Sequence, residues 1–135
     1  MAYMPRRTEN MKQEKTIKYL GFTIKCLLLS EDEKAPVIYG IPFREGSAGG
    51  VVKGDDNSFT VWFSDIPTMD ALVHETYHLF CYIMEVMNGD NCFTWNELNA
   101  EIYAYNFHAL YDEISDTFIS MPLYKKIYNM KKALN

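Results

Sequence analysis

The sequence predicts an α+β fold, with strands in the first half of the chain and helices in the second. Up to residue 64, short runs rich in β-branched and aromatic residues are separated by turn residues. After residue 65, the hydrophobic period changes to that of a helix, and the long runs end at a glycine or a proline. A block of strands followed by a block of helices is typical of α+β proteins.

The composition is that of one globular domain. The 135 residues are 48 % hydrophobic and 15 % aromatic, which is enough apolar material for one core. No internal repeat or linker divides the chain, and residues 1–15 are polar, charged and without periodicity. We therefore expect a flexible N-terminal arm over 1–15 and a single domain over 16–135.

Two strands and a hairpin are expected before the helices. The first strand covers 16–29, and the second covers 35–43, where Pro36 and Pro42 restrict it to an edge or a strand end. Residues 51–64 fit a hairpin, because the sequence GDDN is turn chemistry between two β-prone runs.

Two long helices and a short one are expected after the hairpin. The first covers 65–89, with Thr68 as its N-cap and Gly89 just after its C-terminus. Its second half is so apolar that we expect it to be buried on most sides. The second covers 94–118, and the short basic helix covers 123–134. This last helix either docks on an acidic surface or is a solvated amphipathic helix.

The first long helix contains HETYH, with His74, Glu75 and His78 in the order H-E-x-x-H. Residues four apart share one face of a helix, so both imidazoles can bind one ion while Glu75 is turned aside. In zinc hydrolases, zinc lowers the pKa of a bound water to about 7, and the glutamate accepts its proton as general base. The alternative is a helix with two hydrogen-bonded histidines and a surface glutamate.

A catalytic zinc takes three protein ligands, so one ligand must come from elsewhere in the chain. The extended pattern H-E-x-x-H-x-x-G-x-x-H fails, because Cys81 and Met84 stand at its glycine and its last histidine. The second long helix offers Glu101 and Glu97. We favour Glu101, because Glu97 has a competing role in a capping box with Thr94.

Four further residues are candidates for smaller roles. His108 lies on nearly the same helix face as Glu101, and it is either a partner of the site or a histidine among core aromatics. Tyr105 and Tyr77 either donate a hydrogen bond to an oxyanion or pack. Cys92 is either a ligand for a soft metal or a free thiol.

HETYH followed by the glutamate of EIYAY resembles the gluzincin-type zinc metallopeptidases, and most of all the small single-domain metallopeptidases encoded in phages. The run ELNAEIYAYNFHAL is also similar to the ligand helix of ImmA/IrrE-type peptidases. The resemblance covers 58–110 and implies a minimal zincin, in which a small antiparallel sheet packs on the active-site helix. It also implies an edge strand along the cleft, expected at 58–64, where an extended peptide could add as a further strand.

The resemblance assigns His74 and His78 as zinc ligands, Glu75 as general base and Glu101 as the third ligand on the second long helix. NELNAE also resembles the thermolysin-type run N-E-x-x-S-D, in which Glu97 would be the ligand and Glu101 would orient His74. The Ser-Asp pair of that run is absent here. The choice between Glu101 and Glu97 therefore stays open.

The sequence thus predicts a zinc-dependent peptidase that acts on a peptide or protein substrate. The alternative is a non-catalytic zinc-binding interaction module in phage assembly or host interaction, whose closed site would need a fourth ligand such as His108 or Cys92. A net charge of −5 argues against nucleic acid as the partner. The apolar runs are too short for a membrane span, and 3 irregularly spaced cysteines form no disulfide framework. We expect a cytoplasmic protein of a bacterial host or a phage-infected cell.

Overall fold

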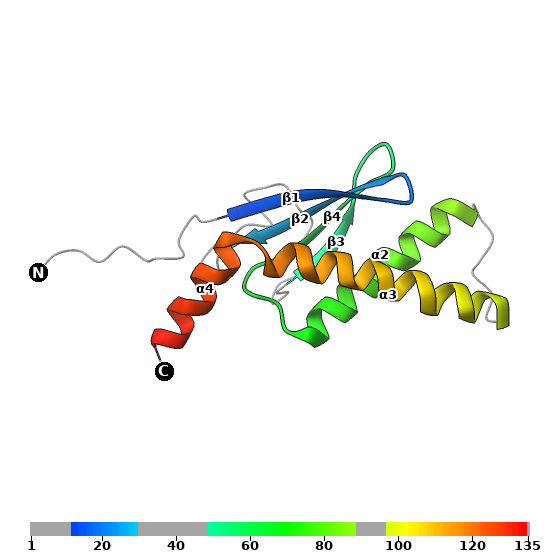
Figure 1. The fold of residues 1–135 in the computed structure, drawn as a ribbon. Coiled ribbons are helices and arrows are strands. Elements are labelled where there is room, and N and C mark those ends of the chain that lie inside the picture. The colour runs from blue at the N-terminus through cyan, green and yellow to red at the C-terminus, as the bar shows by residue number, and fades with distance from the viewer. Residues whose placement is uncertain (1–11, 30–48, 89–96, 135) are drawn as a thin grey trace, which may run out of the picture.

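The structure is a computed structural model that describes residues 12–29, 49–88 and 97–134, without the side chains of 88 and 97–102. Within these residues, a 4-stranded sheet is covered on one face by helices (Figure 1). The strands precede the helices in the chain, so the predicted α+β fold is confirmed. None of the described helices has the length and apolar character needed to cross a membrane.

The sheet is mixed. Its strands, in the spatial order β1-β2-β4-β3, are β1 (Lys12–Tyr19), β2 (Phe22–Leu29), β4 (Ser58–Phe63) and β3 (Gly49–Lys53). The outer pairs are antiparallel, but β2 and β4 run parallel at the centre. The prediction of an antiparallel sheet is therefore wrong. The physical reason is that β2 and β4 both end in continuous buried apolar runs, which suit the two interior positions.

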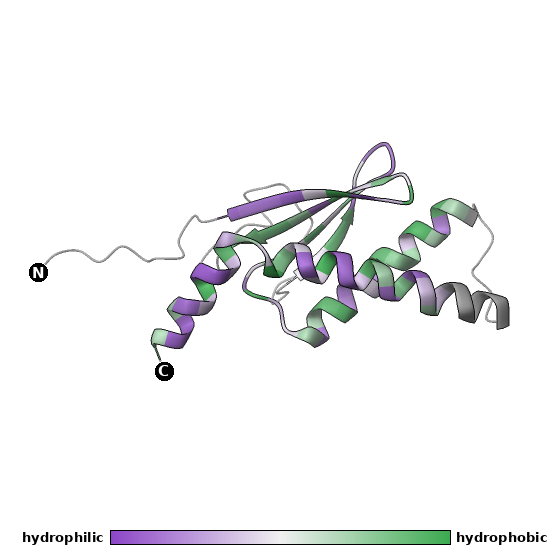
Figure 2. Cartoon of the chain, viewed as in Figure 1, coloured by the Kyte–Doolittle hydropathy of each residue, from purple (hydrophilic) through white to green (hydrophobic). Residues whose placement is uncertain are grey.

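The first predicted strand is a hairpin. The chain turns at Leu20 and Gly21, whose φ values are 50° and 84°, and β1 pairs with β2 along its whole length. Residues 12–15, predicted in the N-terminal arm, belong to β1, and 1–11 lie outside the described residues. Figure 2 shows why the strand was hard to recognise, since most of β1 is hydrophilic while β2 is hydrophobic.

The second hairpin is confirmed. β3 and β4 pair antiparallel across a turn in which Asp56 and Asn57 have positive φ. However, β4 lies between β2 and β3, so the prediction that 58–64 is the edge strand is wrong. The edge on this side is β3, and its apolar content is too small for an interior position. The strand predicted over 35–43 lies outside the described residues.

The helices are α2 (Met69–Asn88), α3 (Glu97–Ile119) and α4 (Pro122–Ala133), close to the three predicted ranges. The predicted N-cap is confirmed, because Thr68 Oγ1 accepts a hydrogen bond of 3.1 Å from Ala71 N. Gly89 and Thr94, the other predicted terminal residues, lie outside the part that the structure describes.

One main core fills the space between the sheet and the helices. Alternate residues of β2 and β4 point into it, and α2 and α3 add their apolar faces. Its largest fully buried members include Ile24, Leu28, Phe59, Phe63, Leu79, Phe80, Ile83, Leu110, Ile114 and Phe118. The helices contact different strands: α2 packs on β3 and β4, and α3 packs on β2. α2 therefore lies above the β3 edge of the sheet.

Candidate metal site

Helix α2 buries one face and exposes the other. Leu72, Leu79 and Ile83 are buried against the sheet, and the Thr76 side chain is fully buried among them. His74 and His78 lie on the exposed face, and Glu75 is half-buried at its border. The prediction that this helix is buried on most sides is therefore wrong. A single buried face is enough to hold a helix on a two-layer fold, and the site residues are left open to solvent.

The two imidazoles converge on one point. His74 Nε2 and His78 Nε2 are 3.1 Å apart, and the ring centroids are 4.7 Å apart at an interplanar angle of 73°. An ion bound at the usual zinc–nitrogen distance of about 2.0–2.1 Å from both atoms would have an N–metal–N angle of about 100°, close to tetrahedral. The nitrogen pair thus already has a separation that zinc requires.

Glu75 completes a group of three possible ligands. One ligand atom each of His74, Glu75 and His78 lies within 4.8 Å of the other two. Burial raises the pKa of the Glu75 carboxyl above its ordinary value, and the nearby His74 and His78 act in the opposite direction. A carboxylate with a raised pKa is a stronger base, which is the property that a general base needs.

The third predicted ligand remains a prediction. Glu101 and Glu97 both belong to α3, but their side chains are outside the described part of the structure. Among the side chains that are described, His74, Glu75 and His78 form the one group of three or more possible metal ligands. The structure thus places the two histidines and the glutamate of the motif together and leaves the choice on α3 open.

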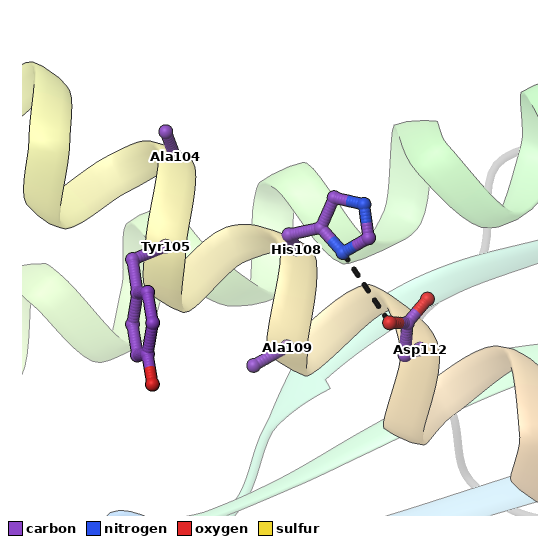
Figure 3. A pocket seen from close by; sticks show the side chains of 5 residues that line it. All are labelled: Ala104, Tyr105, His108, Ala109 and Asp112. Atoms are coloured by element: carbon purple, nitrogen blue, oxygen red, sulfur yellow. Dashed lines mark ion pairs between the residues drawn. The ribbon is translucent and has the colours of Figure 1, made fainter.

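His108 lies elsewhere, on the outer face of α3. Its Nδ1 is 3.3 Å from Oδ2 of Asp112 in an exposed ion pair, and Ala104, Tyr105 and Ala109 complete a surface hollow (Figure 3). The interpretation of His108 as a histidine among core aromatics is therefore wrong. The reason is helical periodicity, since the buried face of α3 is set by residues such as Leu110 and Ile114.

Tyr105 points away from the core as well. Its side chain is 79 % exposed, and Figure 3 shows it on the same outer face of α3 as His108. Of the two roles considered for Tyr105, packing in the core is therefore wrong, because the residue lies on the solvent-exposed face of the helix. Cys92 lies outside the described residues, and Cys81, three residues after His78, is partly buried.

Sequence reasoning missed an aromatic cluster next to the motif. Tyr103 on α3 stacks on Phe107 at 5.0 Å and meets the ring of Phe80 edge-on at 5.1 Å. Tyr77 bridges this cluster and the site, with ring centroids 6.3 Å from Tyr103 and 6.0 Å from His78. The four-residue spacing of Tyr103 and Phe107, in register with the apolar face of α3, was the available indication.

No protein-family model, curated protein or solved structure matches the chain. Only the fold and the site therefore indicate what the protein does. Together they define a small α+β protein in which helix α2 carries an H-E-x-x-H group able to hold a metal ion.

Proposed function

We propose that the protein is a zinc-dependent peptidase in which His74, His78 and Glu101 hold the metal and Glu75 is the general base. The observation that carries this proposal is the 3.1 Å approach of the two Nε2 atoms, with the Glu75 carboxyl in the same group. Without a metal, the two rings can share one hydrogen bond between these nitrogens, which uses only one lone pair. A bound cation satisfies both nitrogen lone pairs at once.

Each residue of the motif has a role that fits its environment. Zinc, when bound, supplies a Lewis acid and lowers the pKa of a coordinated water. Glu75 would accept a proton from the water whose oxygen attacks the peptide carbonyl, and would pass it to the amine that leaves as the C–N bond breaks. Burial favours the protonated form of Glu75, so the carboxylate takes up this proton more readily than an exposed glutamate would. The solvent-exposed side of the two histidines leaves room for a peptide to approach.

Elemental analysis of the purified protein tests the metal and its third ligand. We expect close to one zinc per chain in the wild type, loss of zinc in Glu101→Gln, and retention in Glu97→Gln. Glutamine preserves the size and helix propensity of both positions, so the two variants are matched controls. Loss in Glu97→Gln alone would assign the ligand to Glu97. Absence of zinc in the wild type, also after titration with the metal, would overturn the proposal.

Glu75→Gln tests the reaction separately from the metal. We expect this variant to bind zinc like the wild type and to lose at least about 100-fold in peptide cleavage, the low end of what general-base catalysis contributes. The substrate for the assay is an unstructured protein such as casein, with the cleavage products identified by mass spectrometry. Equal cleavage by the wild type and Glu75→Gln would rule out this mechanism.

The second candidate function is a non-catalytic zinc module that binds a partner protein. It is favoured by the hollow on the outer face of α3, where the exposed Tyr105 side chain lies beside Ala104 and Ala109 (Figure 3). A large exposed aromatic side chain is a common anchor at protein interfaces. This function predicts that Glu75→Gln has no effect and that Tyr105→Ser removes partner binding.

A further inference from the structure

An apolar ledge runs alongside the two histidines. It consists of Val73 and Tyr77 on α2 together with Tyr103 on α3. Val73 precedes His74 and Tyr77 precedes His78, so the ledge follows the histidine pair along the helix on the side of α3. The exposed fractions are 40 % for Val73 and 39 % for Tyr77, and Tyr103 is half-buried. These apolar groups are thus accessible right next to the candidate metal ligands.

The ledge is held in place from behind. The Tyr77 ring is edge-on to the rings of His78 and Tyr103, with centroids 6.0 Å and 6.3 Å away. Tyr103 in turn is fixed by its stack on Phe107. The Tyr77 side chain is 39 % exposed, so its ring offers an apolar surface to a ligand. A surface fixed in this way needs little ordering when a ligand binds.

The opposite side of the histidine pair differs. Tyr82 lies two turns after Glu75 on the same side of α2, and its side chain is 37 % exposed. Its ring stacks on Phe59 of β4, with the centroids 6.1 Å apart and an interplanar angle of 9°. One face of the Tyr82 ring is therefore covered by the sheet. Tyr77 and Tyr82 are therefore similar in type and exposure, yet Tyr77 faces the α3 side and Tyr82 the sheet.

We propose that the ledge is a specificity surface that binds an apolar side chain of the peptide, aromatic or long aliphatic, next to the bond that is cleaved. This inference rests on the proposed peptidase function, since a carbonyl at the metal fixes where the flanking side chain falls. The Tyr77 ring centroid is 6.0 Å from that of His78, within reach of such a side chain. In an extended peptide, side chains alternate between two sides, so one flanking side chain points toward the ledge.

The test uses hydroxamic acids, which bind a metal without being cleaved, on the zinc-loaded protein. Calorimetry compares acetohydroxamic acid with 3-phenylpropionohydroxamic acid and with succinic monohydroxamic acid. We expect the phenyl compound to bind roughly tenfold more tightly than acetohydroxamic acid, as one apolar contact provides, and the carboxylate compound to gain nothing. Tyr77→Ser removes the gain. Tyr77→Phe retains it, because the ring and not the hydroxyl makes the contact.

Tyr82→Ser is the matched control on the same helix, and Tyr128→Ser is the remote control on α4, where Tyr128 is similarly exposed. Both should leave the tenfold gain unchanged. Equal affinities of the three compounds for the wild type, or loss of the gain in Tyr82→Ser instead of Tyr77→Ser, would overturn the ledge and leave the metal site standing. No binding of any hydroxamic acid, with no zinc retained, would overturn the peptidase function and the ledge with it.

Discussion

Two exposed helix faces each present a pair of polar side chains four residues apart. One pair consists of two histidines, and the other consists of a histidine and an aspartate. On α2, His74 and His78 face each other with Nε2 atoms 3.1 Å apart. On α3, His108 faces Asp112 at 3.3 Å. A histidine and an aspartate attract each other as an ion pair. Two imidazoles at this distance can share one hydrogen bond, or they can offer two nitrogen lone pairs to a cation. The same spacing therefore gives a surface contact on α3 and a candidate metal site on α2.

Removing one imidazole from each face gives the largest expected difference. His78→Ala should weaken zinc binding by more than about 100-fold, because loss of a direct ligand exceeds the 10–100-fold cost of losing a group that supports one. His108→Ala should leave zinc affinity unchanged. Competition with a chromophoric zinc chelator measures both. A fall in affinity in His108→Ala would place that residue at the metal after all.

Metal binding should also stabilise the fold through the α2 face only. At a free zinc concentration of about 100 times the Kd, the free energy of unfolding should rise by about 2.7 kcal/mol. Thermal unfolding with and without zinc measures this rise, and a chelator should reverse it. His108→Ala should show the full rise, and His78→Ala should show less than about 0.4 kcal/mol, because its affinity is at least about 100-fold lower. A full rise in His78→Ala would indicate zinc bound at another site.

The pH dependence of stability should single out Glu75 in the metal-free protein. Its folded-state pKa lies above the ordinary 4.5, so its contribution to stability is fully present below 4.5 and is lost as pH rises through the folded pKa. At neutral pH the charged carboxylate is therefore a cost. Glu75→Gln should raise the free energy of unfolding at pH 7 and have a smaller effect at pH 4, as measured by urea denaturation with chelator present. A loss of stability at pH 7 would contradict this sign.

The smallest effect is expected from the α3 pair. Asp112→Asn should lower the free energy of unfolding by no more than about 1 kcal/mol, since both partners are exposed. The loss should shrink further in high salt, where the interaction is screened. Urea denaturation at low and high salt measures it. A larger loss that does not depend on salt would mean that Asp112 has a role beyond this pair.

The group of possible metal ligands was predictable because its members are close together in the sequence. Two histidines four apart on a helix share a face whatever the rest of the chain does, and Thr68 capped the same helix as expected. The side on which His108 lies also follows from helical periodicity, but only when all the apolar positions of α3 are considered together. Residue-by-residue interpretation of His108 and Tyr105 missed this.

Long-range pairing was harder to predict. The parallel contact of β2 with β4 depends on which strand of the second hairpin docks, and the apolar runs indicate this only when β4 is compared with β3. The start of strand β1 was hard to predict for another reason. It is an edge strand whose polar side chains serve distant groups: Gln13 Oε1 accepts a hydrogen bond of 2.8 Å from Leu123 N, and Lys15 Nζ donates to Ser120 Oγ at 3.0 Å. No pattern within residues 12–19 predicts such partners.

These two contacts have a consequence for how the chain is synthesised. Gln13 and Lys15 are made early, but their partners are 110 and 105 residues further along the chain. A ribosome adds about 5–20 residues per second, so β1 is synthesised several seconds before its hydrogen-bond partners. In a nascent chain that ends before residue 120, β1 lacks both of these hydrogen bonds. Emergence of residues 120–123 from the ribosome, and not formation of the first hairpin, is therefore the step at which this edge of the sheet is closed.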